Sequence, residues 1–354
     1  MLWILSYEPP KALNLSFSFV SLLTLPYSTR VRRVNEVIVV EFNRKKIFLD
    51  SKSFKKMVPD FIFVSHAHSD HLPDSSFNFR VISSEETRLM ILAKGKKYNF
   101  IDEPDSYKDE FELIKTNHIL GSRALLIKDD GGVLYTGDIN DKWFFSAEVQ
   151  NLPKARTLLI EATYGLPRFL FNSPKDTLKE AKDLMLDLLR KGKSIIILGY
   201  PLGKSQHLQL FFDKYLINFN NYVYSSISLY NDIYSVFSYK ILPKIQVNLN
   251  TLTNLLKSKS SVVYLPLHLA KNKIVQSLRG RNFSLIAFSG WALESSFKER
   301  LQVDYAFPVS DHADYYGLIN IVKDVDPEVV YVTHGFVESF SASLRKEGFT
   351  AHPL

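Results

Sequence analysis

Residues 66–71 read HAHSDH and place three histidines and one aspartate within six positions of the chain. The stretch directly follows residues 61–64 (FIFV), an apolar run that predicts a buried strand. Four metal-binding side chains at one strand end suit two closely spaced divalent ions better than a single ion. Because two-metal centres serve hydrolysis, this interpretation requires that other parts of the chain supply the remaining ligands.

The composition limits both the fold and the chemistry. The chain has 354 residues, of which 46% are hydrophobic, enough for a sizeable core in one large domain or two moderate ones. It contains no cysteine, which excludes disulfides, thiolate metal sites and a cysteine nucleophile. Any metal must therefore be held by His, Asp and Glu, ligands that suit Zn, Mn or Fe.

The net charge is modestly basic. The chain has 44 Lys and Arg residues against 37 Asp and Glu residues, a balance of +7 that is compatible with a polyanionic partner. The basic residues are scattered in short clusters, so the charge alone is weak support for nucleic-acid binding.

Residues 12–29 carry no charged side chain and are rich in Leu, Phe and Ser. A transmembrane helix needs about 20 mostly apolar residues, whereas Asn14, several serines and Pro26 interrupt this run, so we expect no membrane span. A signal peptide is less favoured, because no small-x-small cleavage site is evident. We expect residues 1–34 to be an extension of uncertain structure, or to reflect a start codon placed too far upstream, in a cytoplasmic protein.

Strand-like apolar runs occur in two separated parts of the chain, and the pattern between them is different. There, residues 175–190 have apolar positions at helical spacing, residues 195–198 predict a buried strand, and a second helical stretch follows near 206–216. This alternation predicts an α/β unit inserted into a larger, β-rich α/β domain. The predicted division is 35–166 and 301–354 for the larger domain and 167–300 for the insertion.

Six apolar runs each end close to a His, Asp or Glu, and six of the nine histidines lie at such ends. Loops at the ends of rigid strands are where sites are built, whereas scattered core histidines would not follow this distribution. The residues concerned are His66, His68, Asp70 and His71 after residues 61–64, His118, Asp138, Glu161, Asp311 and His312 after residues 303–307, and His334.

These side chains can be divided between two ions. On an extended chain His66 and His68 point to the same side and can bind one ion together, and His118 can complete its ligands. The second ion would take Asp70, His71 and His334, with Asp138 as a bridge. The two metals would lie ~3.5–4 Å apart and activate water at neutral pH.

Other interpretations stay open at single positions. His118 could be a loop histidine without a ligand role, and Asp138 could cap a turn. Asp50 could orient a ligand histidine or be a turn residue. His207, His268 and His352 match no site pattern, so we interpret them as surface or core histidines.

At this point the chain resembles a known family. The HAHSDH motif, His118 and Asp138 resemble the metallo-β-lactamase fold, and three later motifs resemble motifs A, B and C of the β-CASP nucleases. Those motifs are residues 161–165 (EATYG), 310–314 (SDHAD) and 332–335 (VTHG). Residues 200–206 (YPLGKSQ) and 289–291 (SGW) resemble the short prokaryotic branch, whose members are usually labelled RNA-processing or ligase-associated exonucleases. The resemblance covers about residues 35–340.

The resemblance implies an αββα sandwich with an inserted β-CASP domain that closes over the site to form a nucleic-acid cleft. It implies that His312 is the general acid, or a phosphate contact at the leaving oxygen, and that Glu161 orients it. It also implies two Zn²⁺ ions, with Mn²⁺ as an alternative, and counts Asp70 among the catalytic residues. The implied ligands are His66, His68 and His118 on one metal, Asp70, His71 and His334 on the other, and Asp138 on both.

Lys204 and Ser289 are the predicted substrate-binding residues. Lys204 lies between a strand and a helical stretch, where it could contact phosphate with help from the helix N-terminus or be a solvated loop lysine. Trp291 could stack on a base, but burial at the domain junction is favoured. Arg123 stands where the family more often has a small residue, which could alter the cleft wall.

We therefore expect a two-zinc phosphodiesterase that acts on RNA or single-stranded DNA, as an exonuclease in RNA processing or DNA repair. RNA is slightly favoured, because a histidine at motif C, here His334, is more typical of RNA-directed members. The alternatives are a small-molecule hydrolase of the thioesterase or glyoxalase kind, whose fold lacks counterparts of Glu161 and His312, and an inactive scaffold subunit. We expect a nucleic-acid partner and no membrane partner, and a homodimer stays open.

Overall fold

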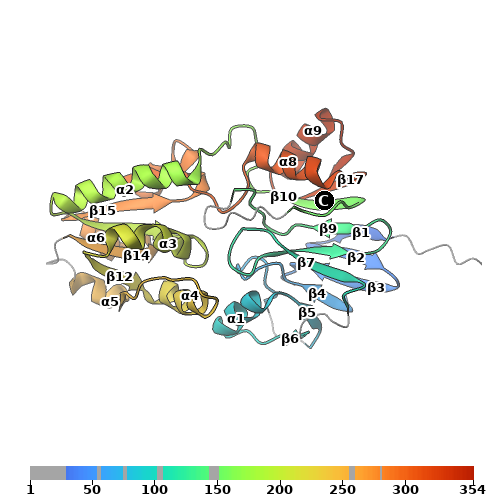
Figure 1. Ribbon diagram of the computed structural model, residues 1–354, viewed down its shortest axis with the longest axis horizontal. Coiled ribbons are helices and arrows are strands. Elements are labelled where there is room, and N and C mark those ends of the chain that lie inside the picture. Colours follow the sequence, from blue (N-terminus) through green and yellow to red (C-terminus); the bar gives the residue numbers. More distant parts are fainter. Residues whose placement is uncertain are drawn as a thin grey trace, which may run out of the picture.

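The computed structural model describes residues 29–53, 57–74, 78–101, 107–142, 151–254, 260–279 and 281–354. Within them the chain forms two lobes that lie side by side in Figure 1. One lobe contains two facing six-stranded sheets, and the other is built on a third six-stranded sheet. Most of the predicted N-terminal extension, residues 1–28, lies outside the described residues. None of the described helices has the length and apolar character needed to cross a bilayer.

The first sheet holds the HAHSDH loop at the end of its fourth strand. Its order is β1 (Arg30–Val34), β2 (Val37–Phe42), β3 (Lys45–Leu49), β4 (Phe61–Phe63), β5 (Arg80–Ile82) and β6 (Asn99–Phe100). The first three strands are antiparallel neighbours, and β3 to β6 are parallel. Helix α1 (Glu85–Ala93) covers the outer face of this sheet through Met90 and Ile91.

The second sheet carries the remaining strand ends of the predicted site. Its order is β18 (Ala351–Pro353), β17 (Val329–Gly335), β10 (Thr157–Ala162), β9 (Val133–Tyr135), β8 (Arg123–Ile127) and β7 (Phe111–Lys115). Helices α8 (Tyr315–Val325) and α9 (Val337–Lys346) pack on its outer face (Figure 1).

The core of this lobe lies between the two sheets. Apolar side chains such as Phe63 of the first sheet and Tyr135 and Leu159 of the second share one buried cluster. With helices on both outer faces, the lobe is the αββα sandwich that the sequence predicts. The short apolar runs that precede the motifs are the buried strands, and residues 61–63 are buried throughout.

The inserted lobe is a parallel sheet with helices on both faces. Its strands are β13 (Ile245–Val247), β12 (Asn220–Tyr224), β14 (Ser261–Pro266), β11 (Ser194–Gly199), β15 (Phe283–Phe288) and β16 (Tyr305–Phe307), in that spatial order. The central strands β11, β14 and β15 are buried at every position, as expected for a sheet covered on both sides. The helices are α2 (Pro174–Arg190), α3 (Lys204–Leu216), α4 (Ser225–Val236), α5 (Leu249–Leu252), α6 (Lys273–Arg279) and α7 (Phe297–Leu301).

The position of the insertion explains why it can reach the site. β10 and β17 are parallel neighbours, with Thr157 opposite Val329, and the inserted lobe lies in the connection between them. The chain leaves the second sheet at the edge where Glu161 and His334 end their strands. After the insertion, α8 leads it back to the opposite edge, where β17 starts.

One strand belongs to a different sheet from the one that the sequence pattern suggests. Residues 303–307 were expected in the larger domain, but β16 pairs with β15 in the inserted sheet, with Ile286 opposite Tyr305. A three-residue apolar strand does not show in its sequence which sheet it joins, because that depends on distant partners. We therefore propose that the insertion extends to Phe307, beyond the predicted boundary at 300.

Candidate metal centre

Four side chains from three strand ends form a cluster at one edge of the sandwich: His66, His68, His118 and Asp138. Nδ1 of His68 lies 3.0 Å from Nε2 of His66 and 3.2 Å from Nε2 of His118. Oδ2 of Asp138 lies 3.4 Å from Nε2 of His66 and 3.5 Å from Nε2 of His118. One ligand atom of each residue lies within 4.8 Å of all the others, so the four could hold a metal ion.

Three further predicted ligands, Asp70, His71 and His334, lie beside this cluster. Nε2 of His71 is 3.5 Å from Oδ2 of Asp138 and 3.7 Å from Oδ2 of Asp70. The ring of His334 stacks on that of His71, with centroids 5.1 Å apart. All seven predicted ligands thus lie together, with Oδ2 of Asp138 within 3.5 Å of histidines from both groups, and their role as ligands stays a prediction.

A local irregularity places His334. The β10–β17 register is interrupted after the pair Glu161–Thr333, and the next pair is Ala162–Gly335. His334 is therefore the extra residue of a β-bulge, and its φ of 53° lies in the left-handed region that non-glycine residues seldom adopt. Bulges re-aim a side chain, and this one puts the imidazole beside His71.

Asp50 fixes the orientation of the His71 ring through a hydrogen bond. Its carboxylate accepts hydrogen bonds from Nδ1 of His71 at 2.8 Å, from Oη of Tyr135 at 2.9 Å, and from the main-chain N–H of Ser65 at 2.7 Å. The bond from Nδ1 turns Nε2 of His71 toward Asp138, and although burial lowers it, the Asp138 and Asp50 carboxylates raise the pKa of His71 well above its ordinary value. The geometry favours the orienting role over the turn role that the sequence also allowed.

Glu161 and His312 form a pair next to the cluster. Nδ1 of His312 lies 2.8 Å from Oε1 of Glu161, and the same oxygen accepts the main-chain N–H of Ile139 at 2.8 Å. Nε2 of His312 lies 4.0 Å from Oδ2 of Asp138. Although burial lowers it, the neighbouring Glu161 carboxylate raises the pKa of His312 to about 9.

The electrostatics of the cluster favour metal binding. Burial lowers the pKa of His66 and His118 well below the ordinary value, so both rings are neutral. Neutral imidazoles and an ionised carboxylate are the forms that bind metal. Asp138 is ionised, because His71 above all, whose own pKa is raised, lowers the pKa of this carboxyl well below the ordinary value despite its burial.

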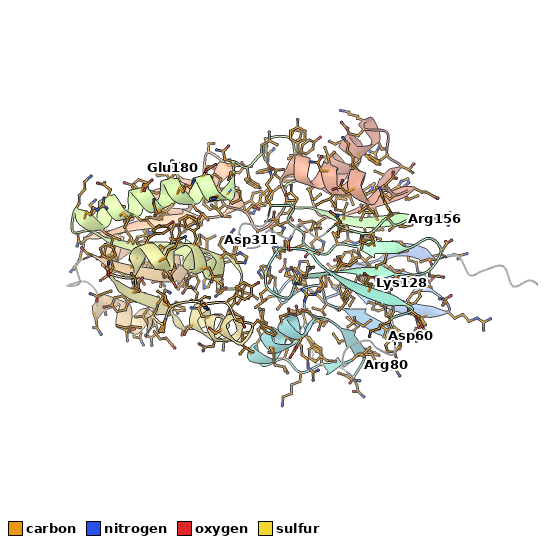
Figure 2. The ribbon with its side chains drawn as sticks, in the orientation of Figure 1. Asp60, Arg80, Lys128, Arg156, Glu180 and Asp311 are labelled. Carbon is orange, nitrogen blue, oxygen red and sulfur yellow. The ribbon has the colours of Figure 1, made fainter. Side chains whose placement is uncertain are left out.

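The inserted lobe also reaches the cluster. Nε2 of His68 lies 3.2 Å from the main-chain oxygen of Leu202, and Nδ1 of His118 lies 2.9 Å from that of Asp311. The Asp311 carboxylate accepts a hydrogen bond from Nζ of Lys204 at 2.8 Å and lies 3.0 Å from Nδ1 of His207. Figure 2 shows Asp311 where the two lobes meet.

A cavity of about 380 Å³ opens above the cluster, between the lobes. Both predicted substrate-binding residues line it. Ser289 caps a short helix through its hydroxyl, and the Lys204 side chain is only 2% exposed. Further lining residues are Lys94, Tyr164, Tyr200, Tyr230, Trp291 and Ser310.

Two residues that connect the lobes beside the metal cluster, Asp311 and His207, were not predicted from the sequence. The sequence motif assigns Asp311 no role of its own, and the sequence predicts only a surface or core histidine at His207. The available signal was the spacing of Lys204 and His207, three residues apart in a predicted helical stretch, which places both on one helix face. The partner that they share lies more than 100 positions away, so no local pattern could identify it.

The αββα sandwich, the His/Asp cluster at its edge and the α/β lobe between β10 and β17 define a metallo-β-lactamase-type fold with an inserted domain. No family model matches the chain. A structure of a protein of unknown function from Enterococcus faecalis V583 matches with a TM-score of 0.60 at 17% identity, over 86% of this chain and 92% of that chain. This likeness supports the fold alone.

Two proteins of similar sequence indicate which group within this fold the chain resembles. A probable DNA ligase of Opitutus terrae is 28% identical over 298 residues, which are 82% of this chain and 28% of that protein. RNase aCSPSF2 of Saccharolobus solfataricus is 28% identical over 182 residues, which are 41% of this chain and 36% of that protein. The matched part is thus about a third of the length of these relatives. Both relatives are consistent with the resemblance to the β-CASP group of the metallo-β-lactamase fold, and the ligase match fits the short prokaryotic branch.

Proposed function

We propose that this protein is a metal-dependent phosphodiesterase that cleaves RNA or single-stranded DNA, with RNA slightly favoured, as an exonuclease in RNA processing or DNA repair. The observation that carries the proposal is the Glu161–His312 pair, 2.8 Å apart, at the border between the His/Asp cluster and the cavity. A small-molecule hydrolase of the same fold has no need of this pair or of a second lobe above it.

The donor set fits divalent metal ions. Ring nitrogens of neutral histidines face one another at 3.0–3.2 Å beside an ionised carboxylate, an arrangement that a shared cation would stabilise. We propose two Zn²⁺ ions, with Mn²⁺ as an alternative: His66, His68 and His118 would hold one, Asp70, His71 and His334 the other, and Asp138 both. Such ions would activate water and offset charge on the phosphate.

His312 is suited to proton donation at the leaving oxygen. Its Nδ1 faces Glu161, which leaves Nε2 for the substrate. With its pKa at about 9, the ring keeps its second proton at neutral pH, so an N–H remains available at Nε2. General acid catalysis of this kind contributes ~10²–10⁴-fold in rate.

The cavity walls suit a nucleotide strand. Nζ of Lys94 lies 3.1 Å from Oγ of Ser69, beside the HAHSDH loop, and can attract a phosphate. Tyr200 lines the cavity from the inserted lobe and is 44% exposed, so its ring is available for stacking on a base. Trp291 also lines the cavity, but it is half-buried and packs against Tyr164 and Phe169, so its ring is less available for stacking.

The substrate preference rests on two features. The histidine at motif C is more typical of RNA-directed members, and one relative of this chain is named an RNase. The other relative is named a probable DNA ligase, so single-stranded DNA is the second substrate to be tested. The cytoplasmic location and a homodimer stay predictions.

The direct test is digestion of 5′-labelled single-stranded RNA and DNA by the purified chain, beside a His312→Ala variant, with metal content measured on both. We expect about two metals per chain and cleavage that falls by ~10²–10⁴-fold in the variant. Equal digestion by both proteins would remove His312 from the mechanism. Turnover of a chromogenic thioester, with none of either oligonucleotide, would overturn the proposed substrate class.

A further inference from the structure

The segment that joins β11 to α3 reaches out of the inserted lobe and touches the candidate metal centre. The main-chain oxygen of Leu202 lies 3.2 Å from Nε2 of His68. At the next residue, Gly203, φ is +86°, and a Cβ would lie 2.2 Å from Cγ2 of Ile119, next to His118. Only a glycine lets this segment lie so close to the loop that carries His118.

The first turn of α3 continues this contact with buried charges. Lys204 and His207 both lie against the same carboxylate oxygen of Asp311, at 2.8 and 3.0 Å. All three side chains are buried, with exposures of 2%, 1% and 7%. A buried ion pair of this kind adds little net stability, because desolvation offsets the attraction, but removing one partner is costly.

The main chain of Asp311 also contacts the candidate metal centre, at His118. Its carbonyl oxygen accepts a hydrogen bond from Nδ1 of His118 at 2.9 Å. This bond fixes the tautomer that leaves Nε2 of His118 facing His68 and Asp138. The α3 segment therefore bears on two of the four residues in the first metal group, His68 through Leu202 and His118 through Asp311.

We propose that Lys204, Asp311 and His207 are positioning residues that couple the seating of the inserted lobe to metal affinity at His66, His68, His118 and Asp138. This inference rests on the metal site of the proposed function. Separation of the lobes would break both contacts at once, so metal binding and cleft closure are linked. A residue that only contacted substrate phosphate would have no influence on metal affinity without substrate.

The test is a titration of the metal-free full chain with Zn²⁺ alone, in competition with a chromophoric chelator and without nucleic acid. Lys204→Met is expected to weaken zinc binding by ~10–100-fold, the usual effect of losing a residue that orients a ligand. Lys204→Arg keeps the charge and is expected to restore part of the affinity. Lys214→Met, at an exposed position of the same helix, is the matched control and should bind zinc like the unmodified chain.

A second variant covers the case in which Lys204→Met does not fold. Gly203→Ala leaves all charges in place but pushes the segment away from Ile119, so it should weaken zinc binding in the same direction. Folded variants that bind zinc as tightly as the unmodified chain would overturn the coupling. An unmodified chain that binds no zinc would instead overturn the metal site of the proposed function.

Discussion

Glu161 determines the protonation state of His312, the residue assigned to proton donation. The carboxylate is buried, and its Oε1 is held by the main-chain N–H of Ile139, so it cannot turn away from the ring. Burial alone would lower the pKa of His312, whereas the Glu161 carboxylate, with smaller contributions from Asp138 and Asp311, raises it to about 9. The two residues lie 151 positions apart and meet because β10 ends at the edge that the inserted lobe overlies.

Replacing Glu161 by Gln should change the pH dependence of cleavage. Because the pKa of His312 is raised, the proton donor is present below about pH 9 and is lost as the pH rises through that value. In Glu161→Gln the pKa of His312 should fall toward its ordinary value of about 6.5, so activity should decline at lower pH. The measurement is the pH profile of cleavage rate. Glu328→Gln, on the surface beside Arg156, is the control. If the loss of activity at alkaline pH were unchanged in Glu161→Gln, the assignment of His312 as the proton donor would be contradicted.

Asp50 offers a second test at the level of one residue. Asp50→Asn keeps the left-handed backbone, since Asn tolerates the φ of 41° found there. The substitution replaces one carboxylate oxygen by an NH₂ group, which cannot accept the hydrogen bonds that His71, Tyr135 and Ser65 donate. The His71 ring is then no longer fixed in its orientation. We expect metal affinity to fall by ~10–100-fold, with loss of one metal per chain at limiting zinc. Asp60→Asn, at the surface, should keep both metals, and full metal content in Asp50→Asn would exclude the orienting role.

At the level of secondary-structure elements, the sequence predicts where the strands lie better than it predicts which strands pair with one another. Apolar runs such as residues 61–64 identify the strands, and the polar residues after them mark the edge where the cluster forms. The pattern does not reveal that β16 joins the inserted sheet, because three apolar residues suit either sheet. It also does not reveal the contact of His207 with Asp311, which depends on how the lobes pack. The β-bulge at His334 is likewise set by pairing with β10, not by local sequence.

A substitution at Gly335 tests whether the β-bulge in β17 positions His334. In Gly335→Ala the new Cβ would lie 2.2 Å from the main-chain oxygen of Ala162, at a φ of +73°. We expect lower stability and reduced cleavage, because β17 must shift and carry His334 with it. Gly348→Ala, where φ is +93° and no atom lies within 4 Å of the Cβ, carries only the backbone strain of ~1–2 kcal/mol. Unfolding in urea compares the two, and equal losses would show that the close approach at Gly335 is unimportant.

At the level of the whole molecule, the function depends on two lobes that share one site. The insertion begins after β10, beside Glu161, and the chain returns from it to His312, which pairs with Glu161, before α8 leads on to β17. The motifs that resemble β-CASP nucleases are spread over residues 66–335, and the fold brings them to one cavity of about 380 Å³. The order of these motifs allowed the sandwich and the insertion to be predicted, whereas the contact between the lobes required coordinates.

Removal of metal should therefore affect the stability of the whole chain. A ligand that binds only the folded state stabilises it by ~2.7 kcal/mol when its free concentration is one hundred times Kd. We expect zinc to raise the unfolding temperature of chelator-treated protein in a concentration-dependent way, as measured by calorimetry. Calcium, which prefers oxygen ligands, serves as the control cation. A melting temperature that does not respond to zinc would contradict a metal centre built from both sheets.

The most direct measurement is anomalous X-ray diffraction at the zinc edge from crystals grown with Zn²⁺. Two peaks are expected, ~3.5–4 Å apart. One should lie among His66, His68 and His118, and the other beside His71 and His334, with Asp138 in contact with both. Crystals that bind zinc elsewhere, while this cluster stays without a peak, would contradict the account.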